Sequence, residues 1–341
     1  MSSESGSVTA RPAPGARTRP VGWQTSQEQI VLLVTIVLLI VFSFTLRGFA
    51  TTANLLNLVR SVSILGILGL GMGLMVISRG IDLSEVAIMA GSWIVTLMLL
   101  NAGLSTPVAL AIGLAVALTI GLTNGILVAF VEVPALFATL ATGYVVFGLS
   151  QWSVGVLIAY VPPNASAALR FVGGGHLFGV PMPIFVFAAA ALVINFFLSR
   201  TSTGRFIYAQ GDNPDAARLT GVAVRPLIVL EYLIVAVLAW LAGLVWIGST
   251  GSISMTVTQG TQIFDVILVV VLGGISLVGG RGSVFSVIVG CALIGTLVNG
   301  LTIMDVNTEV QNIIRGAVLL GAIILDNRLH PRDEETARQG D

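Results

Sequence analysis

The topology of this chain is decided by the stretch Thr203-Gly204-Arg205-Phe206-Ile207-Tyr208-Ala209-Gln210-Gly211-Asp212-Asn213-Pro214-Asp215-Ala216-Ala217-Arg218-Leu219-Thr220-Gly221. It is the most polar segment in the interior of the sequence, and it separates two long apolar runs at 181–199 and 226–248. Four arginines lie in or beside it, at positions 200, 205, 218 and 225. Because positive charge is enriched on the cytoplasmic side of membrane proteins, this bias places the stretch in the cytoplasm.

The second half of the stretch has the signals of a short helix with both ends capped. Asn213 can cap the first turn, Pro214 suits the first helical position, and Gly221 suits the position just past the end. Asp215 adds a negative charge where the helix dipole favours one. We therefore expect about two helical turns exposed to the cytoplasm. The residues leave two roles open, a connector between membrane helices or a surface that receives a partner.

The composition excludes an ordinary soluble domain. Of the 341 residues 55% are hydrophobic and 9% are charged, and the mean hydropathy is +0.99. A soluble domain has about 25% charged residues. The apolar runs are continuous over about 20 residues, which predicts spanning helices and not the alternating segments of a barrel. The sequence therefore indicates an all-α polytopic membrane protein.

Rare residue types exclude further classes. The sequence has no lysine, and a P-loop needs one to reach the nucleotide phosphates, so we expect no ATPase site of that kind. One cysteine, Cys291, and two histidines, His176 and His330, predict neither a disulfide nor a metal cluster. We expect Cys291 to be a small packing residue, and no cofactor to be bound by this chain.

Ten spans fit the hydropathy, near 29–46, 54–78, 83–101, 106–130, 134–159, 181–199, 226–248, 262–278, 282–302 and 309–326. Both termini are then cytoplasmic. We expect a disordered tail over 1–28, a transmembrane domain over 29–326 with its main cytoplasmic loop at 200–225, and a second tail over 327–341. Among the arginines, only Arg47 and Arg170 fall in outside loops. Arg60 and Arg315 fall within or near spans two and ten, where a charge is costly unless it faces a partner or water.

A polar motif follows span two, Ser78-Arg79-Gly80-Ile81-Asp82-Leu83-Ser84-Glu85. Asp82 can cap span three, with Glu85 three residues later completing a capping box. The other interpretation is that Asp82, Ser84 and Glu85 line a transport path, since ionisable groups at membrane depth are functional candidates. Both interpretations remain open.

Span five carries a second set of polar candidates. They are Thr139, Thr142, Tyr144, Gln151 and Trp152. Hydroxyl, amide and aromatic groups on one helix suit a polyhydroxylated solute, because hydrogen bonds orient it while a ring stacks on its apolar face. Hydrogen bonds between helices explain the same residues.

Four motifs, in order, resemble the membrane permeases of the ribose-type family of ATP-binding-cassette (ABC) sugar importers. They are Gly80-Ile81-Asp82-Leu83-Ser84, the segment Pro134 to Leu140, Gly204-Arg205 with Asn213 to Gly221, and the run from Phe264-Asp265 to Gly279-Gly280-Arg281-Gly282-Ser283. The resemblance covers about residues 30 to 326. The chain departs from the family at Arg79, where glycine is usual, and at Glu85-Val86, where valine and glycine are usual. The added charges of Arg79 and Glu85 argue against a pentose, which is the usual solute of that family.

The resemblance implies the permease subunit of an ATP-driven importer for a monosaccharide or related polyol, in a bacterial inner membrane. Spans two to five and seven to ten would form two halves of inverted topology. A second permease copy or paralogue, cytoplasmic ATPase subunits that hydrolyse the ATP, and an extracytoplasmic solute-binding protein would complete the importer, with no nucleic acid. Coupling to the ATPase would use Asn213, Asp215, Ala216, Ala217, Arg218, Leu219, Thr220 and Gly221, with Ala216, Ala217 and Leu219 offering a shallow apolar contact. The outside loop at 162–183 would meet the extracytoplasmic partner.

Two other functions remain open at this level. An ion-coupled secondary transporter of a small polar solute would use Asp82, Glu85, Asp265 or Arg315 as relay groups. A membrane scaffold would transport nothing. Dependence of uptake on a partner ATPase separates the importer from the secondary transporter, and a copurifying ATPase argues against the scaffold.

Overall fold

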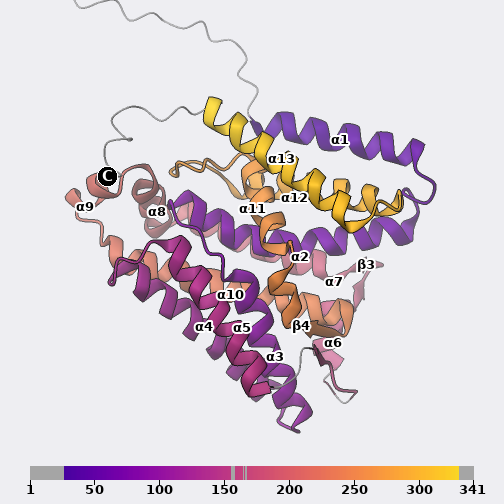
Figure 1. The fold of residues 1–341 in the computed structure, drawn as a ribbon, viewed down its shortest axis with the longest axis horizontal. Coiled ribbons are helices and arrows are strands. Elements are labelled where there is room, and N and C mark those ends of the chain that lie inside the picture. The colour runs from indigo at the N-terminus through magenta and orange to yellow at the C-terminus, as the bar shows by residue number, and fades with distance from the viewer. Residues whose placement is uncertain (1–26, 155–157, 164, 166, 330–341) are drawn as a thin grey trace, which may run out of the picture.

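The structure is a computed structural model that describes residues 27–154, 158–163, 165 and 167–329. These residues form an almost entirely helical bundle (Figure 1). The helices are α1 Gln27–Thr45, α2 Thr52–Ile77, α3 Glu85–Asn101, α4 Thr106–Ala129, α5 Ala135–Val154, α6 Ala167–Gly174, α7 Met182–Arg200, α8 Ser202–Asp212, α9 Pro214–Leu219, α10 Val224–Thr250, the 3-10 helix η1 Met255–Gln259, α11 Gln262–Gly273, α12 Val284–Ile303 and α13 Thr308–Leu329. The all-α prediction is confirmed.

Within the described residues, seven helices are long and apolar enough to cross a membrane: α1, α2, α4, α5, α7, α10 and α12. α3 and α11 are shorter, at 17 and 12 residues. At 1.5 Å per residue α11 rises about 18 Å, less than the roughly 30 Å of an apolar layer. The predicted span at 262–278 is therefore not one continuous helix, and it ends where Gly274 adopts a φ of 98°. The predicted span at 134–159 is also too long, because α5 ends at Val154 and residues 158–160 form a strand.

α2 and α10 form the centre of the bundle. α2 packs against α10, α12, α11 and α7, and α10 also packs against α4 and α3. Residues 66–77 of α2 are buried without interruption. Trp93 of α3 stacks on Trp240 of α10 with ring centroids 5.5 Å apart, and its indole N–H donates to the Trp240 carbonyl at 2.6 Å. Cys291 is fully buried near Gly69, so its predicted packing role is confirmed.

A row of small residues lets α4 approach its neighbours. Gly113, Ala117, Gly121 and Gly125 are all buried on one face of this helix. A Cβ added to Gly121 would lie 2.7 Å from the carbonyl oxygen of Tyr232 on α10. The close approach of the two backbones therefore depends on this stripe.

The two ends of the bundle carry different short elements (Figure 1). α8 and α9 lie at one end, which we call the inner end because the arginine bias assigns it to the cytoplasm. At the other, outer end, strand β1 Ile158–Tyr160 pairs antiparallel with β4 Ser252–Ser254, and β2 His176–Leu177 pairs with β3 Val180–Pro181. Phe178, at the tip of the β2–β3 hairpin, is 94% exposed.

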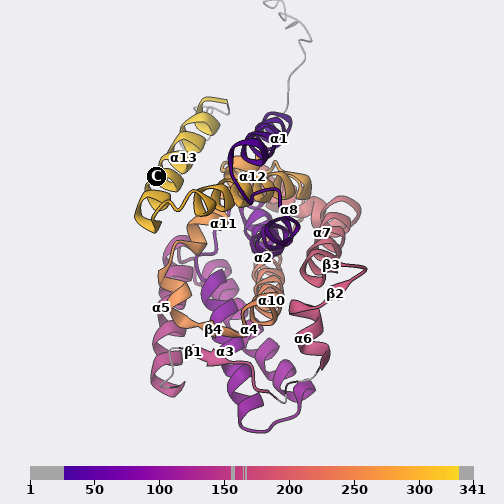
Figure 2. The same cartoon turned by 90° about the vertical axis from the view of Figure 1, so that its right-hand side faces the viewer.

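Helix α1 lies across α12, while Figure 2 shows α5 and α13 on one flank of the bundle and α7 on the other. α1 begins at Gln27, two residues before the predicted span. The carboxylate of Glu28 accepts hydrogen bonds from the hydroxyls of Ser283, at 2.9 Å, and of Ser286. Ser283 caps α12, and its side chain and that of Ser286 satisfy each other's backbone N–H groups. The first turn of α1 is therefore attached to the cap of α12.

Candidate functional site

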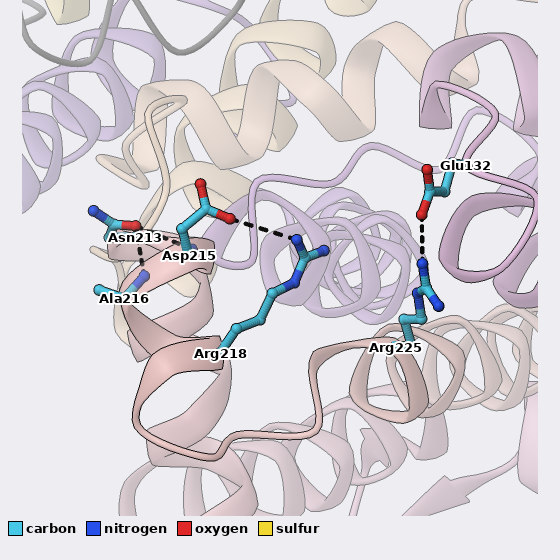
Figure 3. Close-up of polar contacts among 6 residues, drawn as sticks. All are labelled: Glu132, Asn213, Asp215, Ala216, Arg218 and Arg225. Atoms are coloured by element: carbon cyan, nitrogen blue, oxygen red, sulfur yellow. Dashed lines mark hydrogen bonds and ion pairs between the residues drawn. The ribbon is translucent and has the colours of Figure 1, made fainter.

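Helix α9 has both of its predicted caps. The side-chain oxygen of Asn213 accepts hydrogen bonds from the N–H groups of Asp215 and Ala216, both at 3.0 Å (Figure 3). At the other end Gly221 has a φ of 88°, and its N–H donates to the Arg218 carbonyl at 3.0 Å. The N–H of Val222 donates to the carbonyl of residue 217 at 3.1 Å, which completes a Schellman motif. The helix is therefore held in shape by its own ends.

The surface of α9 differs from the prediction at one position. Leu219 is 89% exposed and Ala216 is also exposed, so both are available to a partner. Ala217 is only 4% exposed, because this face of α9 packs against α8 and α10. Ala217 is therefore part of the chain's own packing and not of the predicted contact surface. Arg218 and Asp215 form an exposed ion pair at 3.4 Å, which stabilises the helix little.

Two bridges connect the α8–α9 segment to the bundle, and the first uses Arg79. Its guanidinium donates to the carbonyls of Gly211 and Asp212, at 2.6 and 2.5 Å, at the end of α8. The N–H of Gly280 donates to the carbonyl of Ile77, the last residue of α2, at 2.8 Å. A Cβ on Gly211 would lie 1.8 Å from that same carbonyl oxygen, so only glycine fits. The ends of α2 and α8 and the turn before α12 therefore meet at one junction.

The second bridge lies at the start of α10. Arg225 pairs with Glu132, in the loop between α4 and α5, at 2.5 Å (Figure 3). The guanidinium also lies 6.0 Å from the ring centroid of Phe130. Both side chains of the pair are more than half exposed, so the bridge orients α10 more than it stabilises the protein.

The motif around Asp82 draws three helices together. The Oδ1 of Asp82 accepts from the N–H of Ser84 at 2.8 Å and from its hydroxyl at 2.6 Å. The amide of Asn124, on α4, donates to the Ser84 hydroxyl at 2.7 Å. The N–H of Leu83 donates to the hydroxyl of Thr139, on α5, at 3.1 Å. Asp82, Ser84 and Thr139, three of the predicted candidates, thus lie together at the inner end.

The predicted capping box at this motif is wrong. α3 begins at Glu85, so Ser84 and not Asp82 occupies the position before the helix. Glu85 therefore lies in the first turn itself, two positions too early to reach back to a capping residue. Both of its carboxylate oxygens are buried without a hydrogen-bond partner in the part of the chain that the structure describes. It packs against α2, where a Cβ on Gly71 would lie within van der Waals overlap of one carboxylate oxygen.

A third buried acid was not among the predicted candidates. Glu231 of α10 is 1% exposed and accepts from the amide of Gln210 at 3.4 Å. The neighbouring Tyr232 is fully buried, and its hydroxyl has no hydrogen-bond partner among the described residues. We call Asp82, Glu85 and Glu231 the inner acidic cluster. The sequence signal that could have identified Glu231 is a single acidic residue within a long apolar run. Among the described residues no group of three such side chains is arranged to hold a metal ion.

At the outer end, a polar cavity of about 500 Å³ lies between α2, α10, α11, α12 and α13. We call it the outer cavity. Arg60, Asp265 and Arg315, all predicted candidates, line it. Arg315 donates to a carboxylate oxygen of Asp265 at 3.0 Å and to the hydroxyl of Thr261 at 3.0 Å. Its other terminal nitrogen donates to Gln311 at 3.3 Å. Both arginines therefore face polar protein or a cavity, as the cost of a lipid-facing charge requires.

The remaining candidates on α5 do not join either site. Gln151 and Trp152 lie 12 and 13 residues after Thr139, which separates them by about 18 to 20 Å along the helix. Trp152 is 85% exposed, and the hydroxyl of Thr142 donates to its own helix. Tyr144 lines a separate cavity of about 450 Å³ between α3, α5, η1 and α11. The polar groups of α5 therefore do not converge on one solute.

The chain is similar to known transport proteins over most of its length. Residues 54–323 match the family described as "Branched-chain amino acid transport system / permease component". The ribose import permease protein of Escherichia coli (strain K12) is 31% identical over 322 residues, which cover 94% of this chain and 99% of the relative. That of Bacillus subtilis (strain 168) is 35% identical over 298 residues, 86% of this chain and 90% of the relative. The L-arabinose ABC transporter permease protein of Azospirillum brasilense is 31% identical over 317 residues, 91% of each chain.

The matched region contains the Asp82 motif, α9 and the outer cavity, so the resemblance seen in the motifs is confirmed. Membership also confirms a transport subunit that spans the inner membrane several times and leaves ATP to a partner. The chain belongs to the branched-chain amino acid transport system permease family of ABC importers.

Proposed function

We propose that this chain is the permease of an ATP-driven importer for a ribose-like or arabinose-like sugar or a related polyol. The observation that carries the proposal is α9, a rigid helix at the inner end that presents Leu219 to the cytoplasm. The relatives named above import ribose and arabinose, which supports the solute class. The secondary transporter and the scaffold find no support in a family of permease components.

In this proposal α9 docks on a cytoplasmic ATPase subunit and passes its movement to the membrane helices. The hydrogen bonds from Arg79 to the carbonyls of Gly211 and Asp212 support this transmission. They connect the loop after α2 to Asp212, the residue directly before the α9 cap. Asp82 follows Arg79 by three residues, so movement there reaches the motif that holds α3, α4 and α5 together. The Arg225–Glu132 pair gives a second connection, to the loop between α4 and α5.

We further propose a ten-pass topology in which both termini, before Gln27 and after Leu329, are cytoplasmic. α2 to α5 and α10 to α13 would then form two halves of inverted topology. Each half ends in a helix on the same flank, and the exposed α5 and α13 there support a second permease subunit packing on that flank (Figure 2). The solute-binding protein would dock at the outer end, where the β2–β3 hairpin exposes Phe178.

The test is a charge placed on α9. Leu219→Glu should leave the fold intact, because the side chain is 89% exposed and glutamate is a good helix former. If Leu219 enters an apolar groove of the ATPase, the buried charge should lower retention of the ATPase by about tenfold or more, which is about 1.4 kcal/mol. The measurement is copurification of the ATPase with the tagged permease, with substrate-stimulated ATP hydrolysis in proteoliposomes.

Phe178→Glu is the matched control, since it puts the same charge on an equally exposed residue at the outer end. It should retain the ATPase while weakening stimulation by the solute-binding protein. Full retention and full stimulation with Leu219→Glu would make α9 a connector. A wild-type complex that never copurifies with an ATPase would refute the importer itself.

A further inference from the structure

We infer that the outer cavity binds an anionic group, a carboxylate or a phosphate, carried by a polyhydroxylated molecule. In the transport cycle that molecule is the solute, which narrows the proposed class of sugars and polyols to a sugar acid or a sugar phosphate. This last step rests on the proposed importer function.

The inference begins with the charges that line the cavity. It contains two guanidinium groups, Arg60 and Arg315, and one carboxylate, Asp265. A terminal nitrogen of Arg315 forms an ion pair with an oxygen of that carboxylate at 3.0 Å. The side chain of Arg60 has no hydrogen bond or ion pair within the described residues, and its Nε is buried without a partner. One positive charge of the cavity is therefore uncompensated.

The position of Arg60 makes that charge significant. Arg60 lies eight residues after the start of α2, about 12 Å along the helix. An unpaired cation at membrane depth is costly and marks a functional site by default. Guanidinium is planar and has five donors, which match carboxylate and phosphate with two parallel hydrogen bonds. An oxyanion in the cavity would compensate the charge of Arg60.

Other lining groups suit the rest of a polyhydroxylated molecule. Asn57, Ser61 and Gln262 line the cavity, and their side chains make no hydrogen bond within the part of the chain described, so they can bind hydroxyls. Trp246 adds a ring on which an apolar sugar face can stack. Asn299 is already paired with Asn54 through two amide hydrogen bonds, at 2.9 and 3.0 Å, and contributes to the wall.

The experiment compares two polyols that differ in charge. The full-length permease, in nanodiscs of zwitterionic lipid, is titrated with D-gluconate and with D-glucose, and binding is followed by Trp fluorescence and by thermal stability. Gluconate should raise the unfolding temperature and change the fluorescence, and glucose should not. Arg60→Gln should raise the half-saturating gluconate concentration at least tenfold. Trp246→Phe should reduce the fluorescence response and keep the thermal one.

Two further variants control for folding. Arg205→Gln removes an exposed arginine of α8 that makes no side-chain bond in the described structure, and it should bind gluconate as the wild type does. Arg60→Lys retains the charge, and it should keep a weakened gluconate response even if Arg60→Gln does not fold. Equal responses to glucose and gluconate, or an unchanged response in Arg60→Gln, would overturn the inference.

A lipid phosphate offers the same chemistry, and native mass spectrometry separates the two sources. A permease prepared from phosphatidylglycerol-containing membranes should release that lipid on gluconate addition if the solute competes for the cavity. If gluconate is inert and Arg60→Gln alone loses the lipid, the anion site stands and its assignment to the solute fails. Because these measurements need no ATPase, their failure leaves the coupling role of α9 unaffected.

Discussion

Asp82 and Asp265 are both buried aspartates beside the start of a short apolar helix, one at the inner end and one at the outer end of the bundle. Asp82 accepts both of its hydrogen bonds from Ser84, two residues later. Asp265 is paired with Arg315, fifty residues later and on another helix. The inner aspartate therefore fixes the shape of its own turn, whereas the outer one holds α11 against α13.

The surroundings of the two aspartates sharpen this difference. The inner acidic cluster is closed, and neutral donors such as Ser84 and Gln210 are its partners. The outer aspartate opens onto a cavity that holds an excess of positive charge. A change at the inner end should thus act through the geometry of one loop, and a change at the outer end through the attraction between two helices.

The largest effect on uptake is expected from Asp82→Ala. Removing the acceptor frees the Ser84 hydroxyl and the turn that contacts Asn124 and Thr139, at a cost of about 2 kcal/mol in stability. Uptake by the reconstituted complex should be abolished while assembly with the ATPase is normal. Asp82→Asn is the control, because its amide oxygen can accept the same two hydrogen bonds and should preserve most of the uptake. Uptake near the wild-type rate with alanine would reduce the motif to a structural turn.

The next effect, a loss of stability, is expected from Asp265→Ala. The side chains of Arg315 and Asp265 are 16% and 11% exposed, so removing the carboxylate leaves a nearly buried charge unpaired. We expect a loss of about 3 kcal/mol in the free energy of unfolding. The double change Asp265→Ala with Arg315→Met should recover part of it, measured by thermal unfolding in detergent. Losses that simply add would show that the two side chains are not coupled.

The smallest effect is expected from Glu85→Gln. Both carboxylate oxygens lack a partner in the described structure, so glutamine keeps the shape of the side chain and removes a costly charge. Stability should stay the same or rise by up to about 1 kcal/mol. Glu132→Gln is the control at an exposed pair, where the change should be under about 1 kcal/mol and shrink in high salt. Strong destabilisation by Glu85→Gln alone would show that this acid is ionised and paired.

The features that the sequence predicted well are decided by neighbouring residues. The caps of α9 at Asn213 and Gly221 depend on backbone groups within a few positions. The same is true of the apolar runs, whose length and continuity indicate helices directly. The presence of Arg60 and Arg315 in polar surroundings follows from the cost of the alternative.

The features that the sequence could not supply are decided by packing between distant segments. Ala217 and Ala216 are identical residues one position apart, and only contact with α8 and α10 buries one of them. The start of α3 at Glu85 depends on Asn124 and Thr139, which belong to other helices. Arg60 and Arg315 come together because α2 and α13 line the same cavity. No local sequence pattern predicts that the two helices share it.

The attachment of Glu28 to Ser283 also constrains the order of biosynthesis. The two residues are 255 positions apart, and the chain is made from its N-terminus at about 5 to 20 residues per second, so the partner of Glu28 appears about 13 to 51 seconds after it. During that time the contact between α1 and α12 cannot form. Among the described helices α1 is thus made first, and it gains its contact with the cap of α12 only when that helix has been made.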